Sequence, residues 1–370
     1  MSEYQYYEFQ AIDRPLTMQE QDEIGKRSSR VKLTPTQAIF EYHYGDFRGG
    51  PEEILTQYFD MMFYIANWGT WQLMFRFPKA IVQPKWFQPY DLPDTITIST
   101  TSDYIILDIQ ITEEEGLRGW IKGEVWMPRL LPLRDELLRG DLRLLYLVWL
   151  RTAPYLTELE DDPVEPPIPP NLDKLSEPLQ AFVEMVELDL NWVAAAAQAS
   201  AHQETIAEPP LDHYLSALSA DEKQEFLLKL VRREPHVDLQ LIHRLKELAG
   251  ATQSAPRSNP GHRRLSELQG IAEQIKKNRH QQEQNAARKK RVKELEALAP
   301  REAQTWKRVT ELIELKQAKP YDEATTLLID LRDLAKHQGR LSEFIQRFEK
   351  LKSDYQNRPA LIARFRTIKV

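Results

Sequence analysis

The chain has 370 residues, 42% of them hydrophobic and 28% charged, which is typical of a globular protein rather than a disordered or fibrous one. It contains no cysteine, and this excludes disulfides, thiol nucleophiles and cysteine-ligated zinc. The net charge of -7 conceals a lengthwise split, because residues 1–256 carry 41 acids and 23 bases whereas residues 257–370 carry 15 acids and 26 bases. The back of the chain would therefore attract nucleic acid and the front would repel it, unless the two attract each other.

The first ten residues, MSEYQYYEFQ, lack the basic and apolar regions of a secretory signal peptide. The longest apolar run, residues 144–150, is too short to span a bilayer. We therefore expect a cytoplasmic protein with no membrane contact, and the absence of cysteine fits a reducing compartment.

The first 157 residues are predicted to form an aromatic-rich α+β domain. Alternation with period two over residues 4–12 indicates a strand. Thr17 stands three residues before Glu20, the spacing of a capping box, so a helix is expected through about residue 27. The order βαββαβ predicts a ferredoxin-like module with extra strands. The other expected elements are strands at 30–34, 37–44 and 71–77, a helix at 51–66, further strands at 95–100, 103–111 and 119–127, and a helix from about residue 133 to 150.

An acidic, proline-rich segment at 158–172 is predicted to be a linker. It holds five prolines and five acids, so its backbone should be extended, semi-rigid and solvated. The residues after it, 173–250, have the pattern of a small helical bundle. The helices expected there lie at 174–200, 211–218, 220–232 and 237–249.

The region 262–370 is predicted to be helical and basic, after a second linker at 251–261. Its first helix has an apolar stripe that stops at Ile275, and up to Val292 the only further apolar residues are Ala286 and Ala287. A helix without an apolar face is solvent-exposed, bridging or bound to a partner. A helix at 301–318 and a helical hairpin with its turn at Gly339 follow, and the hairpin is similar to one tetratricopeptide-like unit. The cations of the first helix are Lys276, Lys277, Arg279, Arg288, Lys289, Lys290, Arg291 and Lys293.

Five segments together resemble an uncharacterised bacterial family: YQYYEFQAIDRPLT, EYHYGDFRG, YIANWGT, GDLRLLYLVWL and YDEATTLLIDLRDLA. Members of that family begin with the same aromatic strand and keep the acidic, proline-rich linker. The tail from about residue 290 is also similar to the C-terminal region of some bacterial SWIM zinc-finger proteins. Those fingers need cysteine ligands, which this chain lacks, so no zinc function is carried over. The resemblance implies a recurring bacterial, cytoplasmic protein without assigning an activity.

The densest cluster of polar and aromatic residues lies where a strand gives way to a loop, and it comprises Glu41, Tyr42, His43, Tyr44, Asp46, Phe47 and Arg48. Period two puts Glu41 and His43 on one face, and a histidine next to a carboxylate is suited to acid–base work. The alternative is a structural ion pair between Asp46 and Arg48 beside a packed histidine. No phosphate-binding glycine motif occurs, and we expect neither a cofactor nor a metal site.

Two other patterns favour structural roles. Trp68, Trp71 and Trp86 could form a stacking platform for bases, but in so aromatic a domain they are more often core residues. His236 and His243 share a helix face about 10 Å apart along the axis, too far to share a metal without other ligands.

Three functions are compatible with these patterns. The first is a non-enzymatic multidomain adaptor or regulatory interaction protein of a bacterial multiprotein system, with an unidentified protein partner. The second is a nucleic-acid-associated protein that binds through the basic helices at 262–319, with the chain's own acidic linker as the competing partner. The third is an enzyme with a site near Glu41, His43 and Asp46, which requires a concave surface and an accessible His43.

Overall fold

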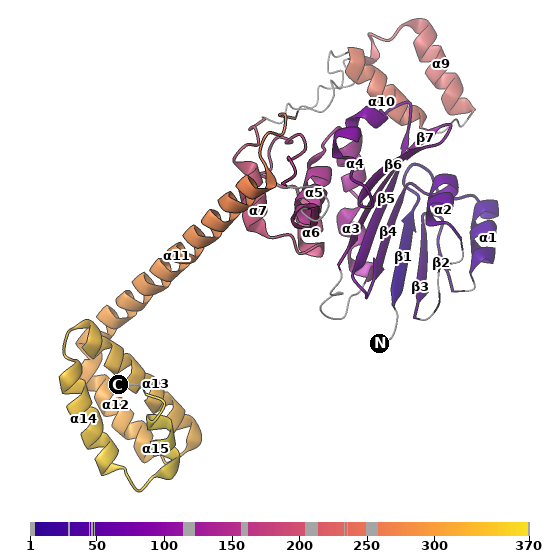
Figure 1. Ribbon diagram of the computed structural model, residues 1–370. Helices are drawn as coiled ribbons and strands as arrows, with labels where there is room; N and C mark the ends of the chain where they lie inside the picture. The colour runs from indigo at the N-terminus through magenta and orange to yellow at the C-terminus, as the bar shows by residue number, and fades with distance from the viewer. Residues whose placement is uncertain are drawn as a thin grey trace. The chain divides into compact units, whose positions relative to one another are not determined.

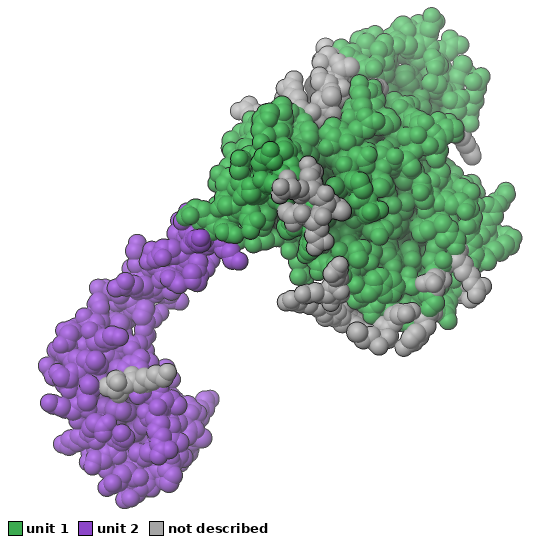
Figure 2. All heavy atoms as spheres, viewed as in Figure 1, with its two compact units in different colours: residues 1–275 green, residues 276–370 purple. Residues whose placement is uncertain are grey.

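The computed structural model divides into two compact units, residues 1–275 and residues 276–370 (Figures 1 and 2). Their boundary falls inside helix α11 (Leu265–Leu298), whereas the sequence predicted boundaries at the 158–172 and 251–261 segments. The residues that the structure describes are 4–28, 30–43, 45, 47, 49–113, 123–156, 162–203, 214–232, 234, 236–248 and 258–368.

Unit 1 contains a seven-stranded antiparallel sheet in the order β2-β3-β1-β4-β5-β7-β6 (Figure 1). Strand β1 pairs with both β3 and β4, so the aromatic strand that opens the chain lies inside the sheet. With helices on both faces of this sheet, the predicted α+β class is confirmed. The strands are β1 (Gln5–Gln10), β2 (Lys32–Leu33), β3 (Gln37–Tyr42), β4 (Met61–Ala66), β5 (Thr70–Pro78), β6 (Ile96–Thr100) and β7 (Tyr104–Thr112).

One face of the sheet is covered by α1 (Met18–Arg27) and α2 (Pro51–Tyr58) (Figure 1). Helix α1 begins at the predicted capping box, in which the Thr17 hydroxyl accepts from the Glu20 N–H and the Glu20 carboxylate accepts from the Thr17 N–H. Its Ile24 is buried with the aromatic residues of β1 and β3. Alternation along each strand thus sends one set of side chains into this layer and the other set to the opposite face.

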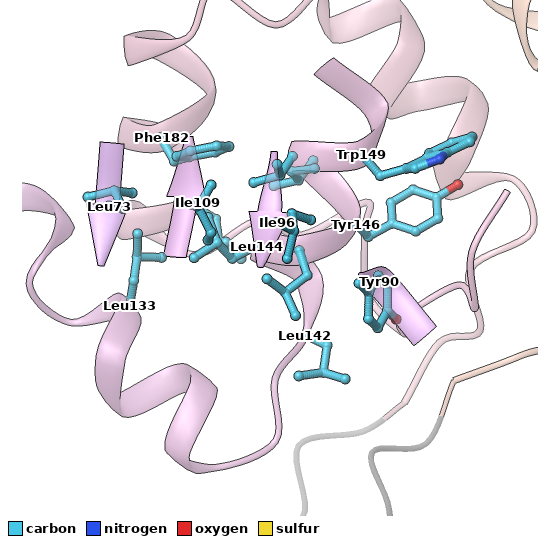
Figure 3. Close-up of a cluster of buried hydrophobic side chains, with 14 of the residues drawn as sticks. Leu73, Tyr90, Ile96, Ile109, Leu133, Leu142, Leu144, Tyr146, Trp149 and Phe182 are labelled. Carbon is cyan, nitrogen blue, oxygen red and sulfur yellow. The ribbon is translucent and has the colours of Figure 1, made fainter. Parts of the chain in front are cut away.

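The opposite face carries the larger core, in which Leu73 and Ile109 of the sheet pack with Leu144 and Phe182 of helices α5 and α6 (Figure 3). The sequence LRLLYLVWL is apolar nearly all round because α5 lies between the sheet and other helices. The helices of this layer are α3 (Met127–Leu130), α4 (Leu133–Leu138), α5 (Arg143–Leu156), α6 (Glu177–Met185) and α7 (Leu190–Ala197).

The prediction of a helix at 51–66 is wrong for the second half of that range. Helix α2 ends at Tyr58, and the run MMFYIA forms β4, which is buried on both faces between β1 and β5. A strand with two buried faces has a continuous apolar sequence that period alone does not distinguish from a buried helix. The strand expected at 119–127 is also wrong where it is described, because Gly123–Val125 forms a 3₁₀ turn and α3 follows; residues 114–122 lie outside the described residues.

The helix expected at 174–200 is two helices, α6 and α7. Between them Glu187 has a φ of 50°, and the Asp189 carboxylate caps α7 by accepting from the Asn191 N–H. Helices α9 (Ala220–Val231) and α10 (Val237–Leu248) confirm the predictions at 220–232 and 237–249. Of the helix expected at 211–218, residues 211–213 lie outside the described residues; Tyr214 and Leu215 are helical, and a turn follows them.

The proline-rich segment is not a solvated linker in its described part, 162–172. Val164 and Ile168 make β-bridges to Arg264 and Asn259, and Ile168 and Leu172 are buried. The Tyr90 hydroxyl donates to the carbonyl oxygen of Pro167 at 2.7 Å. The prolines hold an extended segment that is packed rather than exposed.

Glu165 explains why this segment folds onto unit 1. Its buried carboxylate accepts from the Tyr146 hydroxyl at 2.7 Å and from the Arg263 guanidinium at 2.8 Å. A Cβ at Gly261 would lie well under 3.0 Å from the carbonyl oxygens of Glu165 and Pro166, so the two segments approach as closely as only glycine permits.

Unit 2 contains the rest of α11 and four further helices: α12 (Glu302–Glu314), α13 (Ala318–His337), α14 (Leu341–Asp354) and α15 (Pro359–Phe365). Their core includes Trp306, Leu328, Phe348 and Phe365. The predicted hairpin is confirmed, with Gly339 at a φ of 71° in its turn, and it packs on α12 as expected. Within the described residues, no helix combines the length and the apolarity needed to cross a lipid bilayer.

Candidate functional site

The first candidate site is the basic segment, defined as residues 276–293 of α11. It contains eight cations and one acid, Glu283, and its amphipathic pattern is weak because apolar residues are almost absent. Within the described residues, no ion pair neutralises the seven cations other than Arg291. Those seven side chains are exposed: Lys276, Lys277, Arg279, Arg288, Lys289, Lys290 and Lys293.

Arg291 is the exception and has a structural role. Its guanidinium lies 2.7 Å from the carboxylates of both Asp330 and Asp333 on α13, and their hydrogen bonds raise its pKa. This ion-pair network fastens the end of the basic segment to the helical hairpin. Sequence pattern grouped Arg291 with the other cations because its partners stand about forty residues away.

The competing prediction is that the acidic segment neutralises the basic helix. In the structure, two acids of that segment, Asp162 and Glu165, contact residues outside the basic segment. Glu165 pairs with Arg263, and Asp162 accepts from the Ser266 N–H and hydroxyl at 2.8 Å. Both contacts involve the start of α11 and the residues before it, not the basic segment. Residues 157–161 lie outside the described residues.

The second candidate site is the acid–base pair predicted at the end of β3. His43 Nε2 lies 3.2 Å from Glu41 Oε1, and the His43 side chain is 54% exposed. The two line an open hollow of about 490 Å³ together with Arg30 and Lys32. The structure therefore brings Glu41 and His43 together on an accessible concave surface; Asp46 and Arg48 lie outside the described residues.

The surroundings of this pair are polar and only partly buried. Lys32 Nζ lies 3.9 Å from Glu41 and 3.8 Å from Glu124, and the Tyr4 ring packs 5.6 Å from the His43 ring. Burial and the Glu41 charge raise the pKa of Tyr4. The pair is accessible to a small solute, but none of the described residues that line the hollow is a serine, threonine or cysteine nucleophile.

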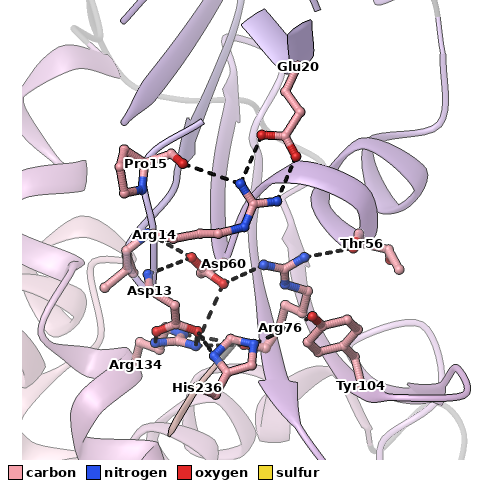
Figure 4. A network of polar contacts seen from close by, with 11 residues as sticks. Asp13, Arg14, Pro15, Glu20, Thr56, Asp60, Arg76, Tyr104, Arg134 and His236 are labelled. Atoms are coloured by element: carbon pink, nitrogen blue, oxygen red, sulfur yellow. Dashed lines mark hydrogen bonds and ion pairs between the residues drawn. The ribbon is translucent and has the colours of Figure 1, made fainter. Parts of the chain in front are cut away.

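A buried network of charged residues lies at one end of the sheet and was not predicted from the sequence (Figure 4). Asp60, only 1% exposed, lies 2.7 Å from Arg76 on β5 and 3.8 Å from Arg134 on α4. It also accepts from the backbone N–H groups of Ile12 and Asp13. Asp60 therefore joins the end of β1 to β5 and α4.

His236 joins the same network from the start of α10 (Figure 4). Its Nδ1 lies 3.1 Å from Asp13, and the Asp13 carboxylate also accepts two hydrogen bonds from Arg134. Burial raises the pKa of Asp13, but His236 and Arg134 outweigh burial and hold that pKa well below its usual range. The His236 ring meets the Tyr104 ring edge-on, with centroids 5.9 Å apart. His236 is thus a buried, packed histidine, whereas the sequence favoured a surface or capping position; the side chain of His243 lies outside the described residues.

Helix α9 presents a third candidate surface because none of its residues is buried. Leu227 and Val231 are spaced four apart and therefore share one side of the helix, and they are 62% and 80% exposed. Leu228 and Leu230 are 44% and 52% exposed. Exposed apolar side chains gathered on one helix are characteristic of protein interaction surfaces.

Two of the three tryptophans weighed as a stacking platform are core residues, as the sequence favoured: Trp71 and Trp86 are 4% and 5% exposed. Trp68 is 42% exposed. Among the described residues, no group of three or more histidine, aspartate or glutamate side chains could hold a metal ion.

No protein-family model matches this chain, and no curated protein or solved structure matches it either. Its function is therefore argued from its own residues.

Proposed function

We propose that this protein acts by binding rather than catalysis, and that it associates with nucleic acid through the basic segment of α11. The observation that supports this is a set of seven exposed cations with no carboxylate partner among the described residues, beside Arg291, which has three. Cations that stabilise a fold are paired, as Arg291 is, so unpaired ones are available to an external polyanion.

At physiological salt, the acids at the front of the chain oppose this binding only where they lie within screening distance of the bound phosphates. Charges separated by more than about 10 Å are largely screened there. A phosphate within contact distance of Lys289 and Lys290 responds to those two charges more than to any acid beyond that range.

A titration of the full-length chain with a fluorescent 20-base-pair DNA duplex, repeated across salt concentrations, tests the proposal. We expect the logarithm of the binding constant to fall linearly with the logarithm of salt concentration. The double variant Lys289→Gln/Lys290→Gln should make that slope shallower by about 1 to 2.

The matched control is Lys85→Gln/Lys350→Gln, which removes two exposed lysines outside α11 and changes the net charge equally. It should leave the slope unchanged. An identical slope in both double variants would remove the basic segment as the binding element, and absence of duplex binding at low salt would end the proposal.

A second candidate, a multidomain adaptor of a bacterial multiprotein system, is favoured by α9. Its exposed Leu227 and Val231 have the spacing by which an amphipathic helix fills an apolar groove of a partner protein. Tagged full-length chain should co-purify a partner that is lost with Leu227→Lys/Val231→Lys but kept with Met18→Lys, which changes an 82%-exposed residue of α1. Recovery of the same partner with all three chains would refute this role for α9.

We also propose that the front of unit 1 is a ferredoxin-like module. The order β2-β3-β1-β4, with α1 and α2 on one face, supports it, and β4 then takes the place of the last strand predicted at 71–77. An experimental structure in which these four strands pair otherwise would contradict it.

A further inference from the structure

The basic segment has a row of amide side chains along one side. Asn278, Gln281 and Asn285 are spaced three and four residues apart, which places them on a single helix face. The Gln281 amide donates to the Asn285 side chain at 3.3 Å, as expected of neighbours on that face. At about 100° per residue, no cation falls within about 40° of the centre of this row.

Cations flank the amide row on both sides. Taking Asn285 as the reference, Lys277 and Arg288 lie about 60° to 80° to one side, and Lys289 and Lys293 lie about 40° to 80° to the other. The remaining three cations lie more than about 100° away. Charge is therefore distributed around the helix, whereas the face centred on the amide row carries no cation.

The composition of the segment excludes two other kinds of partner. A helix that lies on a membrane, and a helix that fills an apolar protein groove, both need a row of apolar anchors. Between Lys276 and Arg291 the only apolar side chains are Ala286 and Ala287. Recognition by this segment must rest on charge and hydrogen bonding.

The major groove of B-form DNA matches this distribution. It is about 12 Å wide and admits an α-helix between two rows of phosphates, so cations on both sides of the helix have partners. Asparagine and glutamine side chains hydrogen-bond the major-groove edge of adenine. Residues 276–290 span about 22 Å, roughly two-thirds of a turn of the duplex.

The packing of α11 in unit 2 leaves the amide row uncovered by α13. Arg291, the residue that contacts α13, lies about 120° around the axis from Asn285. Gln281 and Asn285 are both exposed. The hairpin therefore fastens α11 from a different side than the one that carries the amides.

We propose that α11 binds double-stranded DNA in the major groove, with Asn278, Gln281 and Asn285 toward the base edges and the flanking cations on the phosphates. The inference rests on the proposed nucleic-acid function and adds the form of the nucleic acid and the residues that read it. Duplex RNA is a poorer ligand because its major groove is too deep and narrow for side chains to read.

The test uses the full-length chain and fluorescent 20-base-pair duplexes that are A·T-rich or G·C-rich, with duplex RNA and single-stranded DNA of the same length. We expect the A·T-rich DNA duplex to bind about fivefold or more tightly than the G·C-rich duplex and than duplex RNA. The variant Asn278→Ala/Gln281→Ala/Asn285→Ala keeps the charge and favours the helix, so it should retain the salt slope and lose the sequence preference.

The control variant is Gln284→Ala, an amide about 100° away from the row, which should keep the preference. Three results would overturn the inference while leaving general nucleic-acid binding intact: equal binding of duplex RNA and DNA, an unchanged preference in the triple variant, or equal loss in the control. Displacement of the DNA by polyglutamate at equal charge concentration would also overturn it, because the segment would then bind any acidic polymer. Failure to bind every nucleic acid would instead refute the proposed function itself.

Discussion

The buried network of unit 1 and the basic segment of α11 are both rich in cations, but the two differ in how far those cations are buried and paired with carboxylates. Arg76 and Arg134 are under a tenth exposed and lie against Asp60 and Asp13. Lys289 and Lys290 are exposed and have no carboxylate within reach among the described residues. The contrast shows that this fold neutralises the charges that it buries, whereas the exposed cations of the basic segment remain accessible to the binding proposed above.

The largest expected effect is at the centre of the buried network. Asp60→Ala would remove the carboxylate that pairs with Arg76 and one of the two carboxylates near Arg134. Because buried charge would then be left uncompensated, we expect a loss of about 3 to 5 kcal/mol in the free energy of unfolding. Chemical denaturation monitored by circular dichroism measures this loss. Asp22→Ala, which breaks an exposed pair with Lys26, should change stability by less than about 1 kcal/mol. Equal losses would mean that burial does not distinguish the two kinds of charge.

The next effect concerns the contact between the proline-rich segment and the residues that lead into α11. Gly261→Ala would force a methyl group against the carbonyl oxygens of Glu165 and Pro166, and we expect a destabilisation of about 1 to 3 kcal/mol. Gly270→Ala, where nothing lies within 4 Å of the added atom, should instead stabilise α11 by about 1 kcal/mol. Thermal unfolding of both variants gives the comparison, and a stabilising Gly261→Ala would contradict the close approach.

The dependence of the free energy of unfolding on pH distinguishes a carboxylate whose pKa is raised in the folded state from one whose pKa is lowered. Burial, opposed by Gln72 and reinforced by Glu52, raises the pKa of Asp108 to about 6. The folded state then holds this proton more tightly than the unfolded state, so stability falls as pH rises from about 4 through 6. Asp108→Asn should match the parent chain near pH 4 and exceed it by about 1 to 2 kcal/mol near pH 7. Asp13, whose pKa is lowered, acts oppositely: its contribution is present at neutral pH and is lost on acidification.

The smallest expected effect lies within α11 itself. Lys289→Gln/Lys290→Gln should leave the free energy of unfolding within about 0.5 kcal/mol of the parent, because neither side chain has a partner to lose. Arg291→Gln should reduce it by about 1 kcal/mol, since it removes two hydrogen-bonded ion pairs. Denaturant titration resolves the order of these variants. A larger loss from the lysine pair would show that those charges are structural and would weaken the binding proposal.

Features encoded by neighbouring residues were predictable. The capping box at Thr17, the start of α9, the long α11 and the turn at Gly339 each depend on residues within one or two helical turns. The weak apolar pattern of the basic segment was equally visible, since it is a property of composition.

Features that depend on distant partners were not predictable. Glu165 looks like a solvated linker acid until Arg263, 98 residues later, supplies its partner. Asp13 and Arg134 are separated by 121 residues, and nothing near either one signals an ion pair. The run MMFYIA was read as helix because only its pairing with β1 and β5 distinguishes it as a strand. The Glu41–His43 pair was found because both residues lie on one strand end.

The close contact between Glu165 and Arg263 also determines when unit 1 completes its fold during synthesis. The chain emerges from the ribosome N-terminus first, so the sheet and α5 exist before the residues that close their core. Until residue 263 appears, Glu165 lacks its guanidinium partner, and the apolar surface later covered by Leu265 and Leu268 stays open. A nascent chain halted near residue 250 therefore leaves this surface uncovered, and a fragment truncated there lacks the same cover.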